Sequence, residues 1–179
     1  MRWEERLLEV FDDLEQEAEG LALRARDVAA AERGRELYSE VDLASRLHGS
    51  VGAVVELLVP GAGLLRGRLA RTGRDWCLVA VEDGTGQELV VNLSGLLSAR
   101  GLAPRAAPEP ARAVTTRLGI ASALRRLAAE QEPVVLTRSD GVVRRGRLAR
   151  VGADFVELVV EPGGSEVVPV RVVAVLRRG

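Results

Sequence analysis

Apolar residues near the amino terminus recur at a helical spacing between Trp3 and Ala31. They form two interleaved series, at Leu7, Leu14, Leu21 and Val28 and at Phe11, Ala18 and Ala25. This periodicity predicts a long amphipathic helix with a narrow apolar seam. Gly20 weakens such a helix by about 1 kcal/mol relative to alanine. We therefore expect the helix to dock on the rest of the chain or on a second copy of it.

Two later segments have the pattern of β-strands. Short runs of valine and leucine, separated by glycine, aspartate and proline, extend over residues 51–97 and again over 133–176. Between them, the proline- and alanine-rich stretch 103–110 predicts an exposed linker. A helical pattern follows from Ala111 to Glu130, and Pro133 ends it.

The two strand-rich segments are copies of one another. The stretch from Leu65 to Trp76 recurs from Arg144 to Phe155, at an offset of 79 residues. One copy alone is too small to bury much core, so we expect each copy to close into a small barrel and remove its edges. Gly67 and Gly146 allow a strand to bend sharply at equivalent positions.

These patterns predict an α+β fold in which a long N-terminal helix precedes two small β-barrels. The expected parts are an acidic helical arm over 1–48, a first barrel over 49–98, a Pro/Ala linker over 99–110, and a helix plus second barrel over 111–179.

The charge of the chain also changes at the expected boundary between the helical arm and the first barrel. Residues 1–48 carry 13 acids against 7 arginines, whereas residues 49–179 carry 13 acids against 18 arginines. The asymmetry is typical of a basic binding surface shielded by an acidic tail, and also of two ordinary solvated surfaces. The start of the chain resembles no signal peptide and no apolar run is long enough to span a membrane, so we expect a cytoplasmic protein without a membrane partner.

Few residues are suited to catalysis. The chain has a single cysteine, Cys77, and a single histidine, His48, which excludes an internal disulfide and a cysteine/histidine metal cluster. Cys77 follows Trp76 in a strand-like run, where a thiol usually serves as a small core side chain. Asp75 and Asp154 follow glycine-led turns, and we expect them to stabilise those hairpins. The sequence therefore predicts a non-enzymatic protein with no catalytic residues, metal site or cofactor.

Arginines provide the candidate binding residues. Strand alternation places Arg66 with Arg68, and Arg145 with Arg147, on the face opposite the apolar leucine that follows each pair. These four arginines are the candidate contacts to nucleic-acid phosphates or to a nucleic-acid enzyme. The same pattern is also typical of an ordinary solvated barrel exterior.

The order of helix, strand, Asp-Gly turn and bent strand resembles the Sm-like small β-barrel family. Its Asp-Gly-x-x-x-x-Gly-x-Leu signature is matched by Asp140, Gly141, Gly146 and Leu148. The resemblance implies RNA binding, so RNA is favoured over DNA as the partner. At the positions of the family's base-reading asparagine this chain has Leu78 and Glu157. We therefore expect little sequence preference.

Two other functions fit the sequence. Residues 111–130 resemble a helix-turn-helix with Leu118-Gly119-Ile120 as its turn, which is typical of a DNA-binding transcriptional regulator. Alternatively, the chain is a structural module that binds a protein partner, or itself, through the N-terminal helix.

Overall fold

The computed structural model describes five stretches of the chain, which are residues 38–39, 41–82, 86–104, 118–160 and 163–179. The helix predicted between Trp3 and Ala31 lies outside them. The chain from Asp42 to Gly179 belongs to one structural unit, and the description below concerns that unit.

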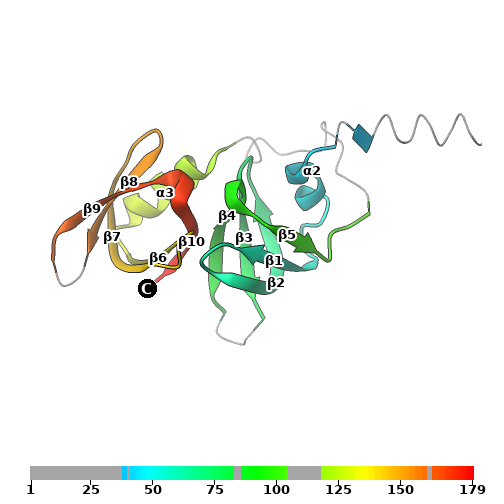
Figure 1. Cartoon of the computed structure of the whole chain (residues 1–179), viewed down its shortest axis with the longest axis horizontal. Coiled ribbons are helices and arrows are strands. Elements are labelled where there is room, and N and C mark those ends of the chain that lie inside the picture. Colours follow the sequence, from blue (N-terminus) through cyan, green and yellow to red (C-terminus); the bar gives the residue numbers. More distant parts are fainter. Residues whose placement is uncertain (1–37, 40, 83–85, 105–117, 161–162) are drawn as a thin grey trace, which may run out of the picture. The chain divides into compact units, whose positions relative to one another are not determined.

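A single sheet of ten strands dominates the unit, and every neighbouring pair of strands is antiparallel. The strand order is β5-β1-β2-β3-β4-β10-β6-β7-β8-β9 (Figure 1). The strands span β1 Val54–Val59, β2 Gly63–Thr72, β3 Trp76–Val81, β4 Glu88–Asn92, β5 Ser98–Arg100, β6 Pro133–Arg138, β7 Val143–Val151, β8 Phe155–Val160, β9 Ser165–Pro169 and β10 Val173–Arg178.

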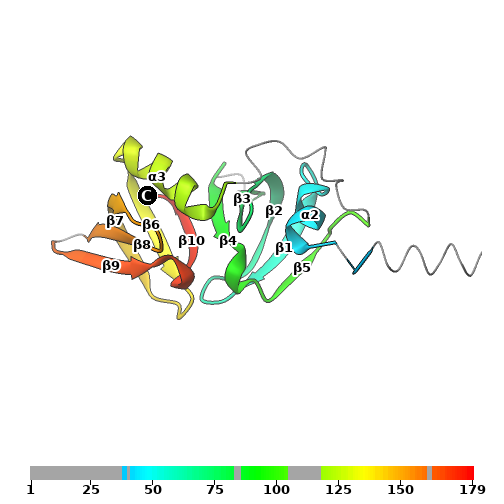
Figure 2. The ribbon, with the colours of Figure 1, turned by 90° about the horizontal axis from the view of Figure 1, so that it is seen from above.

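Two short α-helices accompany the sheet, α2 (Leu43–His48) beside β2 and α3 (Ile120–Glu130) beside β7 (Figure 2). Ile120, Leu124 and Ala128 recur every four residues on one face of α3, and all three are buried. The part of the predicted helix-turn-helix that the structure describes therefore uses its apolar face in the core. Within the described residues, no helix is both long and apolar enough to cross a membrane.

The predicted fold class is wrong, because the strands do not close into two barrels. Closure of each copy would join its last two strands, β4 to β5 and β9 to β10. Instead β4 pairs with β10, so that Val91 lies opposite Val175 and Val90 opposite Leu176. Backbone groups along a strand edge accept any complementary edge. Here β4 of the first copy provides the hydrogen-bonding partners for the edge strand β10 of the second copy. The two copies therefore form one open antiparallel sheet, and the fold is mostly β.

The two copies nevertheless correspond strand for strand. We call residues 42–104 repeat 1 and residues 118–179 repeat 2. Gly67 lies opposite Val55 in repeat 1, and Gly146 lies opposite Val134 in repeat 2. A Cβ atom at Gly67 would collide with the carbonyl of Ala80, and one at Gly146 would collide with the equivalent carbonyl of β8. Only glycine therefore permits this close approach of strands.

Each repeat has its own apolar core, and the two cores share the seam formed by β4 and β10. Successive side chains of a strand face opposite sides of the sheet. Val91 accordingly packs in the core of repeat 1, whereas its neighbour Val90 packs in the core of repeat 2. From β10, Leu176 packs in the core of repeat 2, and Ala174 packs in the core of repeat 1. The seam therefore couples the two repeats through their cores.

Candidate nucleic-acid interface

Each of the four arginines proposed from the sequence lies on the side of its own repeat that faces away from that repeat's core. Along β2, exposed Arg66 and Arg68 alternate with buried Gly67 and Leu69. Along β7, Arg145 and Arg147 alternate with buried Gly146 and Leu148 in the same way. Equivalent positions of the two repeats thus present the same pair of cations to solvent.

In repeat 1 these arginines are compensated by acids. The Arg66 guanidinium lies 3.5 Å from the Glu56 carboxylate, and that of Arg68 lies 3.5 Å from Glu82. Arg68 also donates a 2.6 Å hydrogen bond to the carbonyl of Gly52. In the strand register Glu56 lies between Arg66 on β2 and Arg100 on β5. One carboxylate therefore stands between two cations.

Repeat 2 has an apolar residue where repeat 1 has that carboxylate. Val135, at the position of Glu56, lies between Arg145 on β7 and Arg177 on β10. Within the described part of the chain, neither Arg145 nor Arg177 has an acidic partner; the Arg177 guanidinium donates a long bond, 3.4 Å, to the Arg178 carbonyl. Val135 itself is buried, at 4% exposure, so what this row presents are the two arginines beside it, which have no acidic neighbour in the row.

Arg147 extends the row along β7. It is exposed, and its strand neighbours are Pro133 on β6 and Val159 on β8, neither of which is charged. Glu161, at the position of Glu82, lies outside the described residues. We call Arg145, Arg147 and Arg177 the outer arginine surface.

The spacing of this surface suits a phosphate backbone. Neighbouring strands lie about 4.8 Å apart, so the backbones of β7 and β10, with β6 between them, are separated by about 10 Å. A nucleic-acid strand carries one negatively charged phosphate per nucleotide, so one backbone can contact arginines on both of these strands. Arginine can also form two parallel hydrogen bonds to a phosphate.

Three other arginines of repeat 2, Arg138, Arg144 and Arg150, form ion pairs with acids. Arg138 and Arg144 share the carboxylate of Glu166, at 3.1 Å and 2.7 Å. Arg150 forms an ion pair with Glu157 at 2.7 Å. Leu78, the equivalent of Glu157 in repeat 1, packs against the core of repeat 2. Both residues lie in strands, and their side chains make structural contacts.

The residues considered for catalysis are also accounted for by structure. Cys77 is fully buried, and removal of its thiol from water raises its pKa from 9.0 to about 12. His48 lies 3.1 Å from the hydroxyl of Thr72, on the strand beside α2. Among the described residues, no group of three or more His, Cys, Asp or Glu side chains is placed to hold a metal ion.

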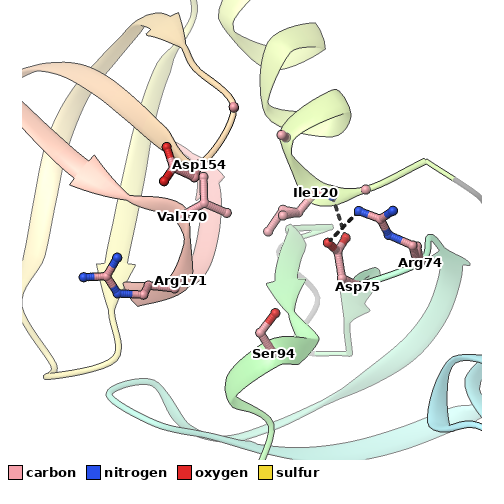
Figure 3. Close-up of a pocket in the computed structure, with 10 residues that line it drawn as sticks. Arg74, Asp75, Ser94, Ile120, Asp154, Val170 and Arg171 are labelled. Atoms are coloured by element: carbon pink, nitrogen blue, oxygen red, sulfur yellow. Dashed lines mark hydrogen bonds and ion pairs between the residues drawn. The ribbon is translucent and has the colours of Figure 1, made fainter.

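Asp75 and Asp154, which are equivalent in sequence, have different surroundings. Asp75 accepts a 2.6 Å hydrogen bond from the backbone N–H of Ile120, the first residue of α3 (Figure 3). The indole of Trp76 donates to the carbonyl of Leu118, just before that helix. Repeat 1 therefore anchors the helix of repeat 2. Asp154 is exposed, and Phe155 has no side-chain N–H equivalent to the indole N–H of Trp76.

A cavity of about 330 Å³ lies beside this anchor, at the seam (Figure 3). Arg74 and Asp75 line it from repeat 1, and Asp154 and Arg171 line it from repeat 2. Arg74 lies 3.8 Å from the Asp75 carboxylate, which also caps α3. The lining thus includes two arginines and two aspartates, whose formal charges cancel.

The sequence matches no model of a known protein family and no curated protein. The function must therefore be argued from the chemistry of the surface itself.

Arg177 and Val135 were missed by the sequence reasoning. They lie on β10 and β6, and only the strand register brings them beside Arg145. Locally, the pair Arg177-Arg178 resembles any charged chain end.

Proposed function

We propose that this chain is a non-enzymatic binding protein whose outer arginine surface contacts the phosphate backbone of RNA. The observation that carries the proposal is the replacement of Glu56 by Val135 at the centre of an otherwise equivalent row. Repeat 1 neutralises its arginines, whereas the row of Arg145 and Arg177 has no acid among the described residues.

RNA is favoured over DNA by the Sm-like resemblance of Asp140, Gly141, Gly146 and Leu148. Backbone contacts by arginine carry no sequence information. The positions that would read bases are occupied by Leu78, packed against a core, and by Glu157, paired with Arg150. We therefore expect affinity that depends strongly on salt and weakly on sequence.

The test compares two matched double variants. Arg145→Glu with Arg147→Glu changes the pair of repeat 2, and Arg66→Glu with Arg68→Glu changes the equivalent pair of repeat 1. Fluorescence anisotropy with mixed-sequence single-stranded RNA, between about 50 and 200 mM salt, measures affinity and its salt slope. Duplex DNA is measured in parallel.

The repeat 2 variant should lose most of its affinity, and its log-log salt slope should fall by roughly 0.7 for each phosphate contact removed. The repeat 1 variant should lose much less. Both should melt close to the parent chain, because exposed substitutions change stability by about 0.5 kcal/mol or less. An equal loss in both variants, or no RNA binding by the parent at low salt, would contradict the proposal.

A further inference from the structure

The seam joins two unlike edges of the repeating unit. Each repeat has the same internal strand order, β5-β1-β2-β3-β4 in repeat 1 and β10-β6-β7-β8-β9 in repeat 2. The seam pairs the last strand of the first series with the first strand of the second. Its counterparts, β9 and β5, are the two free edges of the sheet (Figures 1 and 2). The chain therefore exposes both halves of a contact that it already makes internally.

Apolar side chains at these free edges are exposed, although their counterparts in the seam are buried. On β9, Val167 is 61% exposed, whereas its counterpart Val90 is 9% exposed and packs in the core of repeat 2. Just before β5, Leu97 is 66% exposed, whereas its counterpart Ala174 is 4% exposed and packs in the core of repeat 1. In the seam, each of these positions inserts into the core of the neighbouring repeat.

The register of the seam can be transferred to the free edges residue by residue. The seam uses three pairs, Val91 with Val175, Val90 with Leu176 and Leu89 with Arg177. The equivalent pairs between two chains are Val168 with Ser98, Val167 with Ala99 and Glu166 with Arg100. Although β5 is only three residues long, it contains every residue that this register needs. The last of these pairs joins opposite charges, which favours this register.

We propose that the chain associates head to tail with further copies of itself, β9 of one copy pairing with β5 of the next. Such a contact joins different surfaces, so it continues from copy to copy until the rotation closes a ring or a free edge is left at each end. The association is weaker than the seam. Asn92 donates two hydrogen bonds across the seam, to the carbonyls of Val170 and Val173, but its counterpart on β9 is Pro169, which has no such donor.

Two variants, each with one of the two free edges blocked, test whether the contact joins β9 of one copy to β5 of another. Val167→Asp places a charge on β9 and leaves β5 intact, and Leu97→Asp places a charge beside β5 and leaves β9 intact. Each protein is studied as the full chain by sedimentation velocity, at concentrations up to about 1 mM, where a contact of millimolar Kd is populated. Both positions are exposed, so unchanged melting curves provide the folding control.

The parent chain should sediment faster as its concentration rises, and each variant alone should remain monomeric. An equimolar mixture of the two variants should form a 1:1 dimer and nothing larger, because only one intact β9 and one intact β5 can meet. A parent that stays monomeric throughout, a single variant that still associates, or a mixture that does not dimerise would each overturn the proposal. An isologous contact between two β5 edges, in particular, would leave the Val167→Asp chain able to dimerise.

Discussion

Repeat 1 and repeat 2 share the same strand order and register, but several equivalent side chains make different contacts. Repeat 1 uses Trp76, Asp75 and Asn92 to hold repeat 2, through hydrogen bonds to α3 and across the seam. Repeat 2 has Phe155 and Pro169 at two of these positions, and neither side chain can donate such a hydrogen bond. Buried positions preserve the shared fold, and the positions that differ determine what each edge and face contacts.

The outer faces differ in the same manner. Glu56 in repeat 1 forms an ion pair with Arg66 and lies opposite Arg100, whereas Val135 in repeat 2 leaves the equivalent arginines without an acid in the described structure. A single side chain in the middle of a row therefore changes the charge of a surface without changing the strands that carry it.

A charge introduced at equivalent positions of β4 and β9 should have very different effects. Val90→Asp buries a carboxylate in the core of repeat 2, which costs several kcal/mol because no cation compensates a residue that is 9% exposed. Val167→Asp, 61% exposed, should change the free energy of unfolding by about 0.5 kcal/mol or less. Urea unfolding of dilute protein measures both. Equal effects would show that the seam does not couple the two cores.

Cys77 in the core of repeat 1 corresponds to Val156 in the core of repeat 2. Of these two residues, only the cysteine can make the free energy of unfolding depend on pH. Both residues are fully buried at equivalent positions. The pKa of the Cys77 thiol is raised to about 12 in the folded chain, from 9.0, because burial excludes water. Above pH 9 the unfolded chain loses this proton and the folded chain keeps it, so the contribution to stability falls as pH rises from 9 towards 12.

This loss amounts to about 1.4 kcal/mol per pH unit within that window. Cys77→Val, which copies repeat 2, should remove it. Unfolding free energies of the parent and the variant, compared between pH 8 and about pH 10, measure the difference. If the unfolding free energies of the parent and the variant changed in parallel across this pH range, the raised pKa of Cys77 would be contradicted.

The smallest effect concerns the two aspartates. Asp75→Ala removes the acceptor for the N–H of Ile120 at the start of α3 and should cost about 1 kcal/mol, as the loss of a helix cap usually does. Asp154→Ala, at the equivalent exposed position, should leave the melting temperature unchanged. Thermal unfolding followed by circular dichroism compares the two variants. A matching loss in both would indicate a role within each hairpin instead.

The elements that could be read from the sequence are those specified by neighbouring residues. Alternation correctly placed Arg66 and Arg145 opposite the core. The equivalence of Gly67 and Gly146 likewise follows from the repeated pattern around them. Local pattern did not reveal that the edge of one copy would pair with the other, and so it led to two closed barrels.

The candidate surface was predicted in part for the same reason. Arg145 and Arg147 share a strand and can be found from alternation alone. Arg177 comes beside them only through β6, and the lack of an acid at Val135 has meaning only when its two neighbouring strands are known. Whether an arginine has an acidic partner depends on its neighbours on the adjacent strands, and the sequence alone does not identify those neighbours.

The sequence by itself determined the repeat, the strand-rich segments and the alternation of side chains along the strands. These follow from side-chain period and backbone conformation, which act over a few residues. Only the tertiary structure decided that β4 would meet β10, because the backbone groups of every strand edge are alike. What distinguishes one edge from another is the packing of side chains such as Val90 and Ala174 into a core assembled from distant parts of the chain.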